Sequence, residues 1–389
     1  MRKLVVSTLA VMTLVLTGGA SASLQMGPST GGISSDNVEF IAHIPLAQDG
    51  VGGRIVGKYF YANDQNKIMI FDIKDPVNPQ LTGVLPMPQE WLFSREDLDT
   101  NGEILVIPNQ VTASADGQPE VATNALYIVN VEDKTNPTII SKVVGAASHT
   151  TSCVLDCQWA WGSDGKLIDL RNPTKPKLLD KKWSDGLPAP SGGHDVEEVA
   201  PGLVLTASNP IMFLDIRKNP TKPKLLAVAQ DKDSAVVHTA RWANNARDKF
   251  LLMASETNFR AQCNETTGAF MTWDASQYRK TNTFKLIDKY RMTNGAYIDG
   301  RPAANQAGCS SHWHEASPHF DNGGIVAAAF FEHGTRFIDV SPKGKIEEIG
   351  WFMPFAGSTG AVYWATDKIL YAVDYNRGID ILRWNGPKS

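Results

Sequence analysis

The octapeptide NPTKPKLL occurs twice in this chain, at residues 172–179 and again at residues 219–226. Identical repetition of eight residues indicates an internal duplication. In both copies the octapeptide follows a short apolar segment that ends in Asp, as in KLIDLRNPTKPKLLD and IMFLDIRKNPTKPKLLAV. The aliphatic segments favour buried strands, Asp favours the turn that ends a strand, and proline cannot donate a hydrogen bond to a sheet. The repeated unit is therefore predicted to be two strands joined by a proline-rich turn.

Divergent copies of the unit occur along most of the chain. They begin at Lys67 (KIMIFDIKDPVNPQLTGVL), Ala125 (ALYIVNVEDKTNPTIISKVV) and Arg336 (RFIDVSPKGKIEEIGWF). Each unit extends backwards to a preceding apolar hairpin, so one repeat supplies four strands. Four-stranded units in radial repetition are typical of a β-propeller. We expect six complete blades, at residues 51–88, 89–147, 148–187, 191–232, 235–293 and 309–354.

The two ends of the chain predict how the ring closes. The last repeat supplies only three strands, whereas VEFIAHIPL at residues 38–46 is a strand without a partner. Pairing this segment with the final strand near residues 379–384 completes a seventh blade and hides both sheet edges, which an open sheet would expose. The predicted fold is therefore an all-β, seven-bladed propeller closed by an N-terminal strand. A ring of six or eight blades is the alternative.

The strands before the turns share a short motif: IMIFD at residues 68–72, LYIVN at residues 126–130, and KLID, MFLD and RFID in later repeats. These segments resemble the repeats of the LVIVD family of β-propellers, over nearly all of the chain that follows its N-terminal leader. The resemblance implies a propeller fold. It implies little about activity, since the family consists largely of uncharacterised exported and surface proteins.

The N-terminus predicts export. Two basic residues precede an apolar segment at residues 4–16, and the small-residue run TGGASAS places Ala22 before a cleavage site. This three-part pattern is typical of a secretory signal peptide. The segment is too short and too rich in hydroxyls and glycine for a membrane span, and no later segment is apolar enough. We expect a periplasmic or extracellular protein with a signal peptide at 1–22, a flexible segment at 23–36 and one propeller domain at 37–389.

Composition excludes one class of partner and suggests a disulfide framework. A net charge of −4 does not provide the basic face of a nucleic-acid-binding protein. Four cysteines in an exported chain favour two disulfides. Proximity in the sequence favours Cys153 with Cys157, and Cys263 with Cys309. The alternative for Cys309 is a metal cluster within the segment CSSHWH, which also contains His312 and His314.

A histidine begins the first strand of four successive blades. The segments are HTTSCV from His149, HDVEEV from His194, HTARWA from His238 and HWHEAS from His312. In the other three blades the equivalent positions fall near Gly53, Trp91 and Ser358. First strands line the channel of a propeller, so equivalent positions are related by rotation about its axis. We expect the four imidazoles to point toward one another at one mouth of the channel.

Other polar residues are expected at the same mouth, because the turns between second and third strands lie on that face. Those predicted to bind a ligand there are Asp195, Glu256, Glu332, His333 and Arg336. A concave site with converging imidazoles and carboxylates is typical of ligand binding.

Three interpretations of the histidines remain open. Imidazoles from neighbouring blades could bind zinc or copper, with Glu256 or Glu332 as an oxygen ligand or base. They could instead bind and protonate an anionic or polar substrate. The third interpretation is structural: each histidine hydrogen-bonds the backbone of an adjacent blade. The sequence contains no compact ligand motif such as HExxH, so a metal site depends on convergence in space.

These observations favour an exported propeller that binds a ligand, such as a metal ion, at its channel mouth. One alternative is a copper- or zinc-dependent enzyme similar in architecture to selenium-binding protein and methanethiol oxidase. Another is a cell-surface module that binds a protein or glycan partner. The sequence has no nucleophile elbow, phosphate loop or calcium loop, so no catalytic residue is assigned.

Overall fold

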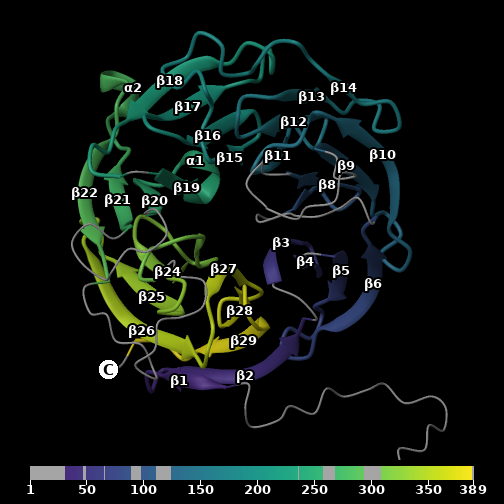
Figure 1. Ribbon diagram of the computed structural model, residues 1–389. Coiled ribbons are helices and arrows are strands. Elements are labelled where there is room, and N and C mark those ends of the chain that lie inside the picture. Colours follow the sequence, from purple (N-terminus) through teal and green to yellow (C-terminus); the bar gives the residue numbers. More distant parts are fainter. Residues whose placement is uncertain are drawn as a thin grey trace, which may run out of the picture.

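The computed structural model describes residues 31–46, 50–64, 66–88, 98–110, 124–234, 236–256, 268–292 and 308–387. Within these residues, seven antiparallel sheets surround a central axis, as Figure 1 shows. Each sheet is one blade, and its first strand lies nearest the axis. The predicted seven-bladed β-propeller is therefore confirmed. Residues 1–22, the predicted signal peptide, lie outside the described part of the chain.

The first three blades follow one another in chain order. Blade one comprises β3 (Gly50–Val56), β4 (Tyr59–Asp64), β5 (Lys67–Asp72) and β6 (Gln80–Pro86). Blade two comprises β7 (Asp99–Thr100), β8 (Ile104–Asn109), β9 (Ala125–Asn130) and β10 (Thr138–Val144). Blade three comprises β11 (Thr151–Val154), β12 (Trp159–Gly162), β13 (Leu167–Asp169) and β14 (Lys177–Leu178).

Blades four and five contain the second octapeptide and both short helices. Blade four comprises β15 (Asp195–Ala200), β16 (Leu203–Ala207), β17 (Ile211–Asp215) and β18 (Lys224–Ala229). Blade five comprises β19 (Val236–Arg241), β20 (Phe250–Glu256), β21 (Phe270–Asp274) and β22 (Lys285–Tyr290). Helix α1 (Ala243–Ala246) follows β19, and α2 (Tyr278–Thr281) precedes β22. No helix in the described ranges is long and apolar enough to cross a membrane.

The last two blades take in strands from the N-terminus. Blade six comprises β23 (His314–Ala316), β24 (Gly324–Ala329), β25 (Thr335–Val340) and β26 (Ile346–Pro354), with β1 (Gly32–Ser34) as a fifth strand. Blade seven comprises β27 (Thr359–Trp364), β28 (Ile369–Asp374), β29 (Gly378–Trp384) and β2 (Val38–Pro45). The segment 23–36, which we expected to be flexible, thus includes a strand whose backbone pairs with β26.

The aspartate at the end of the third strand stops that strand as predicted. In blades three and four, Asp169 Oδ1 and Asp215 Oδ1 each accept the backbone N–H two residues further on, at 3.1 Å. Asp72 does the same in blade one, where the distance is 2.9 Å. Such a side-chain turn satisfies a backbone donor outside the sheet and directs the chain into the proline-rich turn. Both copies of NPTKPKLL therefore connect a third strand to a fourth.

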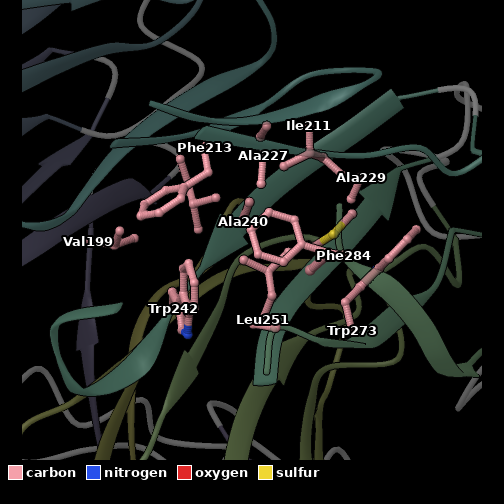
Figure 2. Packing of buried hydrophobic residues seen from close by; sticks show 14 of the residues in the cluster. Val199, Ile211, Phe213, Ala227, Ala229, Ala240, Trp242, Leu251, Trp273 and Phe284 are labelled. Carbon is pink, nitrogen blue, oxygen red and sulfur yellow. The ribbon is translucent and has the colours of Figure 1, made fainter. Parts of the chain in front are cut away.

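Neighbouring blades pack face to face around the complete ring. The described residues form seven separate clusters of buried side chains, and each lies between a different pair of adjacent blades. Figure 2 shows the cluster between blades four and five, where the rings of Phe213 and Trp242 meet edge to face with centroids 5.0 Å apart. The cluster between blades seven and one packs Phe60 against Tyr371, 5.2 Å apart. Closure therefore buries the same kind of apolar interface as every other pair of blades.

The N-terminal strand closes the ring by pairing with the final strand, as predicted. Strand β2 pairs with β29 from Val38 opposite Trp384 to Pro45 opposite Gly378. Within this pair, His43 Nδ1 lies 2.7 Å from Asp380 Oδ1, and both side chains are buried. Arg377 reaches the same carboxylate oxygen at 2.8 Å. A strand from one end of the chain is thus held to a strand from the other by backbone, apolar and polar contacts.

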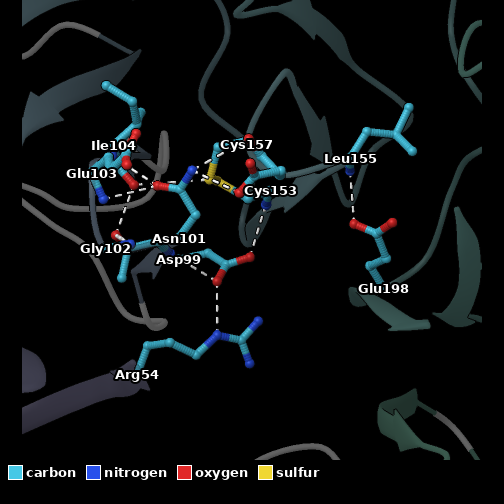
Figure 3. The surroundings of a disulfide bond; sticks show 12 residues. Arg54, Asp99, Asn101, Gly102, Glu103, Ile104, Cys153, Leu155, Cys157 and Glu198 are labelled. Carbon is cyan, nitrogen blue, oxygen red and sulfur yellow. Dashed lines mark hydrogen bonds and ion pairs between the residues drawn. A yellow bond between two sulfur atoms is a disulfide. The ribbon is translucent and has the colours of Figure 1, made fainter. Parts of the chain in front are cut away.

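One predicted disulfide is present at the edge of the channel. Cys153 and Cys157 are bonded across the turn from β11 to β12, with Cα atoms 4.5 Å apart. Leu155, Asp156 and Cys157 all have positive φ, a conformation that L-residues adopt at a cost. Figure 3 shows that Cys153 N–H donates to Asp99 of blade two, and Leu155 N–H to Glu198 of blade four. The bonded turn therefore links blade three to both of its neighbours.

The second predicted disulfide is only partly visible in the described residues. Cys309 is fully buried and disulfide-bonded, which excludes a free thiolate at this position. Cys263, its predicted partner, lies outside the described residues. The pairing of these two cysteines stays a prediction.

Removing β2 should open the ring. Deletion of residues 38–46 exposes the edge of β29 and uncovers part of two interblade clusters, which contain Val38 and Ile44. We expect the melting temperature to fall by about 10 °C or more, since 1 kcal/mol corresponds to roughly 2–4 °C in large domains. Thermal unfolding followed by circular dichroism measures the change. As a control, deletion of residues 31–34 removes only β1 from a blade that keeps four strands, and it should cost a few degrees at most. Equal melting temperatures for the two deletions would contradict closure by β2.

Disulfide mapping tests both cysteine pairs. Non-reducing peptide maps should contain Cys153 linked to Cys157 and Cys309 linked to Cys263. Replacing Cys153 and Cys157 together by Ala should destabilise the protein by about 2 kcal/mol, since the bond closes a short loop. Chemical denaturation of the oxidised protein and of this variant gives the difference. Recovery of Cys309 in any other linkage would refute the second pair.

Candidate metal centre

The structure brings the four predicted histidines together at one end of the channel. They come from blades three to six and lie at or just before the first strand of each. Neighbouring ring centroids are 4.7 Å apart for His149 and His194, 4.0 Å for His194 and His238, and 3.7 Å for His238 and His312. The four imidazoles thus form a continuous row around the channel mouth.

A β-bulge directs the histidine in three of the four blades. In β19 the pairing shifts between Val237 and Thr239, so His238 is the extra residue of the strand. In blade four, His194 N–H donates to Ala207 O at 2.6 Å, and Ala207 is also the pairing partner of Asp195. Two successive residues, His194 and Asp195, therefore lie opposite one. His312 and the residue after it similarly share one partner, Ala329. A bulge places two residues opposite one and re-aims a side chain, which here brings the imidazoles toward one another.

Blade seven has the same bulge in its first strand, but the bulged residue is not a histidine. The pairing of β27 shifts between Thr359 and Ala361, which makes Gly360 the extra residue and corrects the predicted equivalent position near Ser358. His312 Nδ1 lies 2.6 Å from Gly360 O. A carbonyl oxygen only accepts, so Nδ1 carries the proton and the lone pair of neutral His312 is on Nε2. This contact fixes the ring orientation in the way that outer-shell carbonyls orient metal-binding histidines.

Two imidazoles of the row and one neighbouring carboxylate lie close enough together to bind a single cation. His194, His238 and Glu256 each offer a ligand atom, and these atoms all lie within 4.8 Å of one another. Glu256 ends β20 and pairs with Val236, two residues before the bulge at His238. Its carboxylate is thereby held beside the two imidazoles. Two imidazole nitrogens and one carboxylate oxygen are a donor set that suits zinc or copper.

Asp195 lies next to this group in the sequence and is buried. Burial raises the pKa of its carboxyl to about 7, against the effect of Arg241, which favours the charged form. Burial therefore shifts Asp195 toward its protonated form.

The other three predicted ligand-binding residues belong to blade six. Two of them lie in the turn at the channel mouth, and the third, Arg336, contacts the fourth strand of the blade. Glu332 and His333 are buried in the turn after β24, and Ser358 Oγ donates to Glu332 Oε1 at 3.5 Å. This contact joins the turn to the start of blade seven at the channel mouth. Arg336 instead pairs with Glu348 on β26 at 3.5 Å and lies over the ring of Trp351. Its guanidinium holds together the outer strands of its own blade.

Aromatic residues that the sequence did not single out surround one end of the row. The ring of Phe331 lies 4.5 Å from His312, and Tyr375 lies 6.1 Å from the same histidine. At the other end, His149 Nδ1 lies 3.1 Å from Gln110 Oε1. Phe331 and Tyr375 follow the second strands of blades six and seven, so the rule that placed Glu332 at this mouth would also have found them.

The fold and site place the chain in the class of seven-bladed propellers with a histidine-lined channel mouth. Neither the models of known protein families nor the curated proteins searched contain a match to this chain. The resemblance of its repeats to the LVIVD family therefore stays a prediction.

Proposed function

We propose that this protein is an exported β-propeller that binds a transition metal ion, zinc or copper, at its channel mouth. The observation that carries the proposal is the grouping of ligand atoms from His194, His238 and Glu256 within 4.8 Å. His149 and His312 extend the same row on either side and are proposed as further ligands. The four histidines lie at or just before first strands, and Glu256 ends the second strand of blade five. The closed ring fixes the positions of these strands relative to one another.

Packing around the row supports a preorganised site. His238 is fully buried, and its ring meets Trp313 edge to face at 5.2 Å. A bulge in β19 positions the imidazole of His238, and the contact with Gly360 O orients that of His312. Sites built on rigid elements bind a metal with little loss of conformational entropy.

Export is proposed on two independent features. The N-terminal sequence has the three-part pattern of a signal peptide. The disulfide between Cys153 and Cys157 is of the kind that persists in oxidising compartments and is rare in the cytosol.

Metal titration of protein purified without a histidine tag tests the proposal. After removal of bound metal with a chelator, titration with Zn²⁺ or Cu²⁺ in a calorimeter should give one binding event per chain. Replacing His238 by Ala or Glu256 by Gln should weaken binding by about tenfold or more, since each removes one donor.

Replacing His319 by Ala is the matched control. Its side chain is 78% exposed and lies 3.6 Å from Asp367, in the segment after β23. This variant should bind metal like the wild type. Metal-free protein that takes up neither ion, or full affinity in a correctly folded Glu256→Gln variant, would contradict the proposal.

A further inference from the structure

A cavity lies at the end of the first strands away from the histidines. It has a volume of about 380 Å³ and is lined by the later residues of several first strands, among them Arg54, Glu197 and Tyr363, and by segments that follow first strands. His194 and His312 precede β15 and β23, and His238 lies in the first half of β19, whereas later residues of these three strands line the cavity. The cavity and the histidine row therefore lie at opposite ends of these strands. Trp313 stands between them: its ring is 5.2 Å from the ring of His238 and 5.2 Å from the guanidinium of Arg241.

The two arginines of the cavity are matched by two acids. Arg54 Nε pairs with Asp99 Oδ1 at 2.8 Å, and Arg54 Nη2 lies 3.4 Å from Glu197 Oε2. Arg241 Nη1 donates to the same oxygen of Glu197. These pairs reach from blade one to blades two and four, and from blade four to blade five. A ligand that entered the cavity would meet guanidinium groups already held by carboxylates.

Glu315 is different, because none of its contacts within the described residues is with a cation at ion-pair distance. It lies on β23, lines the cavity, and its Oε2 accepts the backbone N–H of Trp364 at 2.5 Å. Glu198 also lines the cavity, but its two oxygens accept the backbone N–H groups of Leu155 and Gly202. Three carboxylates and two guanidinium groups therefore line the cavity, and Glu315 has within the described residues neither an ion pair nor a hydrogen-bond partner for its second oxygen.

Much of the remaining wall is apolar, with four aromatic side chains. Trp242, Trp313, Phe320 and Tyr363 line the cavity together with aliphatic residues. An aromatic ring attracts a cation through the negative charge at its face. A volume of about 380 Å³ is within the range of small-molecule sites in proteins.

We infer that this cavity is a binding site for a small organic cation, such as a primary amine, whose ammonium group pairs with Glu315 while its carbon chain packs on the aromatic wall. The site goes beyond the proposed metal function and does not depend on it, since no residue of the histidine row lines the cavity.

Binding at this site should be coupled to a proton. Burial raises the pKa of Glu315 to about 7, and the charged groups that face it are Arg241 and Arg54, which lower the pKa, and Glu197, which raises it. An ammonium group pairs with the ionised carboxylate, so it must displace the proton that Glu315 carries at lower pH. Affinity should therefore rise by about tenfold between about pH 6 and about pH 8, and binding below neutral pH should release a proton.

Titration with n-butylamine tests the site. Metal-free wild-type protein should bind the amine saturably, at least tenfold more tightly than 1-butanol, which has the same chain without the charge. The measurement is calorimetry, repeated at both pH values and in buffers of different ionisation enthalpy to count released protons. Equal affinity for amine and alcohol, or no saturable binding of the amine, overturns the inference.

Variants locate the bound amine. Glu315→Gln should reduce amine affinity by at least tenfold and abolish proton release, whereas Glu315→Asp keeps the charge and should retain most of the affinity. Glu347→Gln is the matched control, since Glu347 is an exposed carboxylate on β26 of the same blade. If Glu315→Gln fails to fold, Ser317→Trp, which fills the cavity from the segment after β23, should block binding. Wild-type amine affinity in either folded variant overturns the assignment to this cavity.

Discussion

The pairing of β2 with β29 is the constraint on which the rest of the structure depends. A propeller blade has two apolar faces, and each must be covered by a neighbour. Seven interblade clusters satisfy this requirement only because the N-terminal strand completes the last blade and the ring has no free end. The buried contact of His43 with Asp380, which Arg377 shares, adds a polar requirement to the same pairing. Backbone pairing, apolar packing and charge all specify the same register there.

A closed ring converts local irregularities into a site. Equivalent first-strand positions in different blades are related by rotation, so one bulge per strand directs several side chains to one point on the axis. This repetition places His194, His238 and His312 in contact although 118 residues separate the first from the last. Blade seven keeps the bulge and has glycine there, which leaves its carbonyl as the partner of His312. One backbone device therefore supplies imidazoles in some blades and a carbonyl acceptor that orients one of them in another.

Repeats made the fold and the ring closure predictable, because NPTKPKLL and the strand-ending aspartates mark the same turn in successive blades. The histidine register was predictable for the same reason. Arg336 shows what such a pattern does not predict. It is close in sequence to the turn at the channel mouth, but its side chain pairs with Glu348 on the fourth strand of its blade. The bulges, the pairing of β1 with β26 and the Arg54–Glu197 contact were also missed. The last joins residues 143 positions apart that lie in blades one and four, and no local pattern encodes it.

The channel therefore has two chemically different ends built on the same strands. At the start of β15, β19 and β23 the residues are imidazoles, which suit a borderline metal ion. Further along the same strands lie Glu197, Arg241 and Glu315. Glu197 contacts Arg54 of blade one across the channel and accepts from Arg241 of the adjacent blade. Trp313 contacts both groups and separates them. The same set of first strands thus carries the imidazole row at one end and the charged cavity at the other.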